Sequence, residues 1–159
     1  MQLYLLRHGA AESKSLTGRD ADRRLTPAGI AALAEVLDRA RASGLAPDVI
    51  IASPYVRAVE TARVAAERLG YAGEVLQSPT LMPDAAPVGL WEEARALAPT
   101  AAAVLLVAHE PLLSTAVSWM LGETRVVLGF GPGTLVRIDF EVLGPQPRGV
   151  FKWKLEAGV

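Results

Sequence analysis

Short apolar runs alternate along this chain with longer segments in which apolar residues recur at helical spacing. The three strongest runs, at residues 3–6, 48–52 and 104–107, are typical of buried strands. A weaker run at 74–77 predicts one more short strand. Continuous apolar runs of this kind are a property of parallel strands that are covered on both faces. The pattern therefore predicts a parallel sheet with helices between its strands.

The segments between these runs carry the start and stop signals of helices. Thr26 and Pro27 predict the start of a helix, because threonine is a favoured N-cap and proline a favoured first residue. The predicted apolar stripe of this helix consists of Ile30, Leu33 and Leu37. Ser53 and Pro54 predict a second helix, which would end at Gly70. The apolar side chains expected on the second helix are Val56, Val59 and Val64.

Two further helices and a hairpin are predicted in the second half of the chain. Residues 90–97 read as a helix that packs through Trp91, and Pro111 opens another helix. The runs at 134–140 and 150–155 alternate apolar and polar positions, as strands with one buried face do. The residues expected to share one face of the last run are Phe151, Trp153 and Leu155. The predicted fold is an α/β protein, a three-layer α/β/α sandwich whose mainly parallel sheet gains C-terminal antiparallel strands.

Composition limits the classes of protein to which this chain can belong. Its 159 residues can bury a sizeable core, so we expect a single domain over residues 1–159. The formal net charge is -1 and no basic block stands out, which argues against a nucleic-acid partner and an anionic membrane surface. The longest apolar run, at 101–108, is far too short to span a bilayer.

Cysteine and histidine usage narrows the chemistry. The sequence contains no cysteine, which excludes disulfides, thiolate nucleophiles and cysteine zinc sites. Its two histidines lack a suitable carboxylate spacing for zinc, so we expect no metal and no cofactor. A cysteine-free chain without a cleavable N-terminal signal pattern is expected in the cytoplasm.

Three polar clusters follow directly after the three most apolar runs. They are Arg7-His8-Gly9, the segment 53–57, and His109-Glu110-Pro111. Ligands of an open α/β sheet bind beyond the carboxyl ends of its strands. If the three strands are parallel neighbours, the clusters meet at one edge of the sheet. Both histidines of the chain would then lie at that edge.

Such an edge would offer a ligand two arginines, two imidazoles and the N-termini of two helices. These groups favour anions, and several donors together favour a phosphate dianion over a carboxylate. The chain has no glycine-rich phosphate loop and no clear magnesium-binding aspartate cluster, which disfavours a P-loop nucleotide hydrolase. With cysteine absent, histidine is the remaining nucleophile in this cluster that suits phosphoryl transfer.

Three segments of these clusters resemble the signatures of the histidine phosphatase superfamily. They are LLRHG at 5–9, SPYVRAVETA at 53–62 and VAHEP at 107–111. The small size, the segment RRLTPAG and the ending GVFKWKLE are most similar to the SixA-type phosphohistidine phosphatases of that superfamily. The resemblance runs over nearly the whole chain. It implies a phosphoglycerate-mutase-like fold and a phosphatase that acts through a phosphohistidine intermediate.

The resemblance also assigns roles to single residues. His8 matches the phosphate-accepting nucleophile. The residues that match the rest of the phosphate pocket are Arg7, Arg57 and His109. Mutase-type members place an acidic proton donor in a loop after the second motif, and many members carry a polar or acidic residue where this chain has Ala10. The candidates for a donor here are Asp84 and Glu12, and neither is favoured over the other.

We expect the chain to remove phosphate from phosphohistidine in a signalling protein without a metal. A phosphoramidate has a labile P–N bond, so weak proton donation could suffice. Two alternatives stay open: a phosphomonoesterase or mutase that acts on a small phosphorylated metabolite, and a phosphate-binding module without catalysis. In each case we expect neither a nucleic-acid nor a membrane partner.

Structural roles are expected for the other prominent residues. Ser53 is expected to cap a helix, since no histidine base lies near it in the sequence. Glu110 is expected to place a favourable charge at the start of a helix. The residues expected to pack in the core are Trp91, Trp119 and Trp153.

Overall fold

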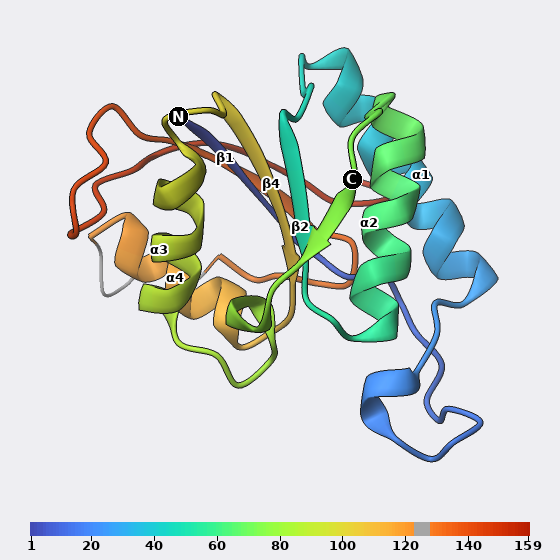
Figure 1. Cartoon of the computed structure of the whole chain (residues 1–159). Helices are drawn as coiled ribbons and strands as arrows, with labels where there is room; N and C mark the ends of the chain where they lie inside the picture. Colours follow the sequence, from blue (N-terminus) through green and yellow to red (C-terminus); the bar gives the residue numbers. More distant parts are fainter. Residues whose placement is uncertain (123–127) are drawn as a thin grey trace.

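The centre of the molecule is one six-stranded sheet with the strand order β3-β2-β4-β1-β5-β6 (Figure 1). The structure is a computed structural model and describes residues 1–122 and 128–159. The strands are β1 (Gln2–Arg7), β2 (Val49–Ala52), β3 (Val75–Gln77), β4 (Ala103–Ala108), β5 (Leu135–Asp139) and β6 (Val150–Leu155). The first four strands are parallel, and β5 pairs antiparallel with both β1 and β6.

Helices cover both faces of this sheet (Figure 1). They are α1 (Pro27–Ala42) and α2 (Val56–Leu69) on one face, and α3 (Pro87–Leu97) and α4 (Leu112–Met120) on the other. Two short 3-10 turns, η1 (Asp20–Asp22) and η2 (Pro79–Leu81), lie in the connections. Each face of the sheet has its own apolar core. The predicted three-layer α/β/α sandwich with antiparallel strands at its C-terminal end is confirmed.

The start of α1 is held against the chain that leaves β1. Thr26 is the N-cap, as predicted, and its Oγ1 accepts the N–H of Gly29 at 3.0 Å. The backbone N–H of Thr26 donates to the carbonyl oxygen of Ala10 at 3.0 Å. A Cβ on Gly29 would overlap with that same carbonyl group, so glycine is required here. These contacts fix the chain just beyond the first polar cluster.

The predicted start of the second helix is wrong, and of its predicted apolar residues Val64 packs against a core, where it is partly buried. Helix α2 begins at Val56 with Tyr55 as its N-cap, so Ser53 does not cap it. The side chains that α2 buries are Arg57, Ala58, Thr61, Ala62, Ala65 and Leu69. Alanine side chains let α2 pack closely beside α1, and hydrophobic spacing alone does not reveal such a face. In α1, Ile30 of the predicted stripe is 42% exposed.

The C-terminal hairpin contains a bulge that its alternation does not predict. Trp153 of β6 pairs with Arg137 of β5. Phe151 pairs with the next residue, Ile138, so Lys152 is an extra residue between the two pairs. The bulge places Phe151 on the opposite face of the sheet from Trp153, so the prediction of one shared face holds for Trp153 and Leu155, which pack against the same core, and is wrong for Phe151. Trp153 packs against a core, whereas Phe151 is 40% exposed.

The tryptophans contribute to the packing as expected. Trp91 is fully buried, and its indole N–H donates to the carbonyl oxygen of Gly144 at 3.0 Å. Trp119 and Trp153 are partly buried at the edges of the two cores. Among the described residues, no helix is both long and apolar enough to cross a membrane.

Candidate active site

The topology brings the three polar clusters to one edge of the sheet. Strands β2, β4 and β1 are neighbours and parallel, so their carboxyl ends lie side by side. The residues that follow these strand ends directly are Ser53, His109 and His8. Arg57 adds its side chain from the first turn of α2. The four side chains are almost completely buried, which is unusual for polar groups and requires specific partners.

The ring of His8 is held in one tautomer by its surroundings. His8 is 7% exposed, and its Nδ1 lies 2.8 Å from the carbonyl oxygen of Gly9. A carbonyl oxygen only accepts, so Nδ1 carries the ring hydrogen and Nε2 carries the lone pair. Arg57 Nε accordingly donates to His8 Nε2 at 3.3 Å. Nε2 is therefore the ring nitrogen that can attack an electrophile.

Gly9 fixes the backbone on which this tautomer depends. Its N–H donates to Thr61 Oγ1 of α2 at 3.1 Å. A Cβ on Gly9 would lie 2.7 Å from Leu33 Cδ1 of α1, closer than carbon atoms pack. A larger residue at position 9 would thus push α1 away from the strand end or displace the carbonyl group that binds His8.

The surroundings keep His8 neutral. Burial is the main cause that lowers its pKa to about 4, and the hydrogen bond with Gly9 opposes this shift. Nearby positive charges lower the pKa further. These charges belong to Arg57, Arg7 and Arg23. At neutral pH the imidazole therefore retains the lone pair that a nucleophile needs.

Arg57 links Nε2 of His8 to Asp20 of η1. It is 5% exposed, and its Nη1 donates to the backbone oxygen of Asp20 at 2.9 Å. Its Nη2 also pairs with Asp20 Oδ2 at 3.3 Å. The guanidinium lies over the ring of Tyr55, 5.0 Å from the ring centroid. Arg57 is thus fixed from three sides before any ligand arrives.

Arg7 lies at the end of β1 beside the same cluster. Its Nη1 donates to the carbonyl oxygen of Phe130 at 2.7 Å. Its Nε is buried and has no hydrogen-bond partner within the described part of the chain. Burial lowers the pKa of Arg7 from its ordinary value, while the charge of Glu110 opposes this shift. The Nε–H of Arg7 is therefore a donor that can bind a ligand oxygen.

His109 occupies the centre of the cluster and is 1% exposed. The centroid of its ring lies 5.0 Å from that of His8 and 5.0 Å from that of Tyr55. Its Nε2 lies 2.7 Å from Ser53 Oγ, and its buried Nδ1 has no partner among residues 1–122 and 128–159. Burial, followed by the charge of His8, lowers its pKa to about 3. His109 is neutral at physiological pH.

The two predicted proton-donor candidates do not contact this cluster in the described residues. Glu12 Oε2 accepts the backbone N–H of Arg24 at 3.2 Å, which places its carboxylate in the loop before α1. Asp84 is exposed in the connection between η2 and α3. Neither carboxyl group forms a hydrogen bond or an ion pair with His8 in the part of the chain that the structure describes.

Glu110 has the structural role that was expected of it. Its Oε1 accepts the backbone N–H of Ser114 at 2.8 Å, in the first turn of α4. This contact satisfies one of the free N–H groups at the helix start. Its carboxylate still acts electrostatically on Arg7, as noted above.

The carboxylate that does reach the cluster is Asp20, which the sequence analysis missed. Besides its pair with Arg57, it accepts from Arg23 Nη1 at 2.8 Å through Oδ1. The hydrogen bond with Arg23 is the main cause that lowers the pKa of Asp20, and the Arg57 charge acts in the same direction. Asp20 and Arg23 lie in a loop without periodicity, so only the three-dimensional contacts reveal them.

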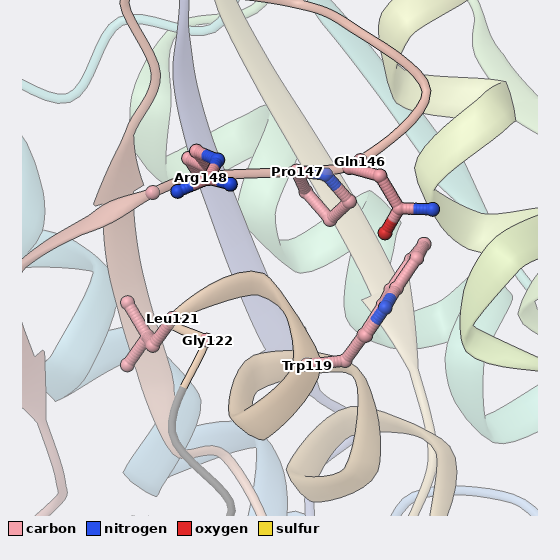
Figure 2. Close-up of a pocket in the computed structure, with 7 residues that line it drawn as sticks. Trp119, Leu121, Gly122, Gln146, Pro147 and Arg148 are labelled. Carbon is pink, nitrogen blue, oxygen red and sulfur yellow. The ribbon is translucent and has the colours of Figure 1, made fainter.

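A pocket of about 490 Å³ lies away from this cluster (Figure 2). It is lined by Trp119, Leu121, Gly122, Gln146, Pro147, Arg148 and Gly149. It adjoins the C-terminal end of α4, whereas His109 precedes the N-terminal end of that helix. Among the described residues, no three His, Asp or Glu side chains gather where they could hold a metal ion.

The model of the histidine phosphatase superfamily, branch 1, matches residues 3–82. This match spans half of the chain and includes His8, Arg57 and the loop with Asp20. The chain belongs to the histidine phosphatase superfamily. Membership of this superfamily supports a phosphatase role. A relative from Picosynechococcus sp. is described as an uncharacterized protein. It is 34% identical over 132 residues, which cover 82% of this chain and 74% of the relative.

Solved structures share the fold of this superfamily member over almost the entire chain. The protein histidine phosphatase SixA in complex with tungstate has a TM-score of 0.88 and 23% identity, and the match covers 98% of this chain and 97% of the other. A protein described as a SixA phosphohistidine phosphatase from Agrobacterium tumefaciens has a TM-score of 0.80 and 25% identity, with 97% of each chain covered. A mycobacterial glucosyl-3-phosphoglycerate phosphatase has a TM-score of 0.70 and 17% identity, with 95% and 96% covered. The fold is phosphoglycerate-mutase-like.

Proposed function

We propose that this chain is a metal-independent phosphatase that transfers a phosphoryl group to Nε2 of His8 and then to water. The observation that carries the proposal is the tautomer of His8. Its Nδ1–H is bound by the Gly9 carbonyl oxygen, so the Nε2 lone pair faces Arg57. A neutral imidazole beside fixed guanidinium groups is what phosphoryl transfer to histidine needs.

In the first step, the Nε2 lone pair of His8 attacks phosphorus, and the bond from phosphorus to the leaving group breaks. The leaving group keeps that electron pair and takes a proton from water. Arg57, Arg7 and His109 are the proposed donors to the phosphoryl oxygens, on which charge accumulates in the transition state. Because Arg57 already contacts Nε2 at 3.3 Å, a phosphoryl group bound to this arginine is placed beside the nucleophile.

In the second step, water attacks the phosphorus of phospho-His8. The new P–O bond replaces the P–N bond, and the electron pair returns to Nε2. The attacking water passes one proton to the hydroxide left by the first step, and inorganic phosphate is released. His8 is then neutral again, with its hydrogen still on Nδ1 and bound to Gly9. The low pKa of His8, about 4, keeps the released ring unprotonated and ready for another cycle.

We infer that the substrate has a good leaving group and that it is phosphohistidine in a protein. The acidic side chain that reaches the cluster is Asp20, and two arginines lower its pKa, so it is ionised and a poor proton donor. A phosphoramidate breaks more readily than an alkyl phosphate without such a donor. One solved structure with this fold is described as the protein histidine phosphatase SixA and another as a phosphohistidine phosphatase SixA, which supports the same substrate class.

A small phosphorylated metabolite is the second candidate substrate. It is favoured by the likeness to the mycobacterial glucosyl-3-phosphoglycerate phosphatase. The deciding experiment compares turnover of a phosphohistidine-bearing protein domain, an aryl phosphate, a phosphoramidate and a set of sugar phosphates. Rapid turnover of the phosphoramidate and the phosphoprotein, with slow turnover of alkyl esters, is expected. Efficient turnover of one sugar phosphate would favour the metabolite instead.

The proposal extends to the organisation of the chain and to its independence of metals. We propose that residues 1–159 form one domain, because β4, β5 and β6 complete the sheet that the matched segment 3–82 begins.

Incubation with EDTA should leave turnover unchanged. A loss of activity on chelation that a divalent metal restores would contradict the mechanism. A phosphate-binding module without catalysis would bind phosphate yet turn over none of these substrates.

A further inference from the structure

Ser53 is a fully buried residue between β2 and α2. It does not cap α2, and the proposed reaction does not use it as a nucleophile. Its hydroxyl oxygen accepts the backbone N–H of Tyr55 at 3.3 Å and lies 2.7 Å from His109 Nε2. The second contact is the shorter of the two. A serine hydroxyl placed in this way can decide which nitrogen of the neighbouring imidazole carries the hydrogen.

The hydrogens of this pair can be counted. A hydroxyl group has one hydrogen to donate and two lone pairs. If His109 Nε2 donated to Ser53, the buried hydroxyl hydrogen would lack an acceptor among the described residues. If Ser53 donates to His109 Nε2 instead, the serine donates once and accepts once from Tyr55, and both of its contacts are satisfied. The second arrangement leaves the ring hydrogen of the neutral imidazole on Nδ1.

Nδ1 of His109 is one of two buried polar side-chain atoms without a partner in the described residues, and the other is Arg7 Nε. Both belong to residues of the same cluster, and both are hydrogen-bond donors in the arrangement just derived. Buried donors without partners are rare in proteins, so two of them beside one nucleophile indicate an absent acceptor. A phosphoryl group carries several acceptor oxygens and fits this need.

We propose that Ser53 is a positioning residue that fixes His109 in the Nδ1–H tautomer, so that this N–H donates to an oxygen of the bound phosphoryl group. The inference rests on the proposed function, because it assumes that a phosphoryl group binds beside His8. It adds a residue whose role depends on its hydroxyl hydrogen. In the opposite tautomer, the Nδ1 lone pair would face the phosphoryl oxygens and repel them.

Nitrogen NMR of the ligand-free protein tests the tautomer without any substrate. With selectively labelled histidine, we expect His109 of the wild-type protein to show a hydrogen-bearing Nδ1 and an unprotonated Nε2. In Ser53→Ala we expect a mixture of both tautomers, because no hydroxyl hydrogen then occupies Nε2. A wild-type His109 with its hydrogen on Nε2 would overturn the proposal.

Binding of vanadate tests the consequence. Because the Nδ1–H tautomer is only partly populated in Ser53→Ala, this variant should bind vanadate about twofold to tenfold more weakly than the wild-type protein, and its kcat should fall more than its KM changes. Ser53→Thr keeps the hydroxyl group and should restore much of the affinity. The matched control is Ser78→Ala, which also removes a buried serine hydroxyl, one bonded to Thr80 at 2.8 Å. Wild-type vanadate affinity in Ser53→Ala would contradict the proposal.

Failure of the proposed function is a separate outcome. It would appear as turnover that survives in His8→Ala, whatever the tautomer of His109. The NMR measurement on the wild-type chain needs neither turnover nor a variant, so the inference can be overturned even if Ser53→Ala does not fold.

Discussion

The ends of β1 and β4 lie side by side, and each is followed by a buried, neutral histidine. The shortest hydrogen bond of each ring involves a different ring nitrogen, Nδ1 in His8 and Nε2 in His109. At the end of β1, His8 gives its Nδ1 hydrogen to a backbone carbonyl group and keeps a lone pair on Nε2. At the end of β4, His109 is bound through Nε2, and its Nδ1 has no partner within the described residues. The residue type and the place in the sheet are the same. The partner of each ring determines which atom is left to react or to bind.

The largest expected effect separates the two histidines. His8→Ala removes the proposed nucleophile and should lower kcat for an aryl phosphate by about 10⁴-fold or more. His109→Ala removes one donor to the phosphoryl group and should lower it by about 10²-fold. Steady-state kinetics measure both, and circular dichroism checks that each variant is folded. Equal losses in the two variants would remove the distinction between nucleophile and donor.

The next effect concerns Arg57, which joins the proposed nucleophile His8 to the loop around Asp20. Arg57→Ala should lower kcat/KM by about 10²–10³-fold and weaken vanadate binding, because a fixed donor in the transition state is lost. The matched control is Arg68→Ala in the same helix, whose guanidinium pairs with Asp38 on the surface. We expect Arg68→Ala to remain within about twofold of wild type. Unchanged vanadate affinity in Arg57→Ala would show that this arginine does not hold the phosphoryl group.

The buried histidines also make stability depend on pH. In the unfolded state a histidine has its ordinary pKa of about 6.5, so it binds a proton as the pH falls through that value. His8 and His109 resist protonation in the folded state until about pH 4 and about pH 3. Between about pH 6.5 and pH 4 the unfolded state therefore binds more protons, and the free energy of unfolding should fall as pH falls, by about 1.4 kcal/mol per pH unit for each histidine.

Denaturant unfolding at several pH values measures this slope. His109→Gln should remove about half of the two histidines' contribution, because glutamine does not titrate. Asp20 does not disturb the comparison, since its pKa is lowered from 3.8 and its contribution to stability is lost below that window. Identical slopes in the wild-type protein and in His109→Gln would contradict the assignment of a neutral, buried His109.

The smallest effects are expected at the two carboxylates that lie away from the cluster. Glu12→Gln and Asp84→Asn should each change the rate with an aryl phosphate by less than about twofold, since a good leaving group needs no protonation. The wild-type rate should fall by about 10²–10⁴-fold from aryl to alkyl phosphates if no acid assists. A large loss in either variant that is confined to alkyl phosphates would reveal a working acid.

The layers of the fold and the meeting of the polar clusters could be predicted because they depend on local patterns. Continuous apolar runs mark buried parallel strands, and residues that directly follow such strands share one edge of the sheet. This reasoning placed His8 and His109 together although about a hundred residues separate them in the sequence. The same reasoning could not give the strand order, which the pairings between the strands settle, among them that of β1 with both β4 and β5.

The predictions failed where a contact between distant segments overrides the local pattern. Asp20 reaches Arg57 from a loop without periodicity, so no spacing rule identifies it. Ser53 has the sequence context of a helix cap, but its hydroxyl group binds His109 and Tyr55 instead. The bulge at Lys152 shifts the register of β6 by one residue, which alternation alone does not show.

The most direct test is the position of the phosphoryl group on the enzyme after a brief reaction with a phosphodonor. We expect a base-stable, acid-labile phosphoenzyme that carries one phosphoryl group on Nε2 of His8, because Nδ1 is bound to the Gly9 carbonyl oxygen. Mass spectrometry without acid treatment identifies the residue, and phosphorus–nitrogen NMR identifies the ring atom. The label should be absent from His8→Ala. A phosphoryl group on Ser53, on His109 or on Nδ1 of His8 would contradict the mechanism.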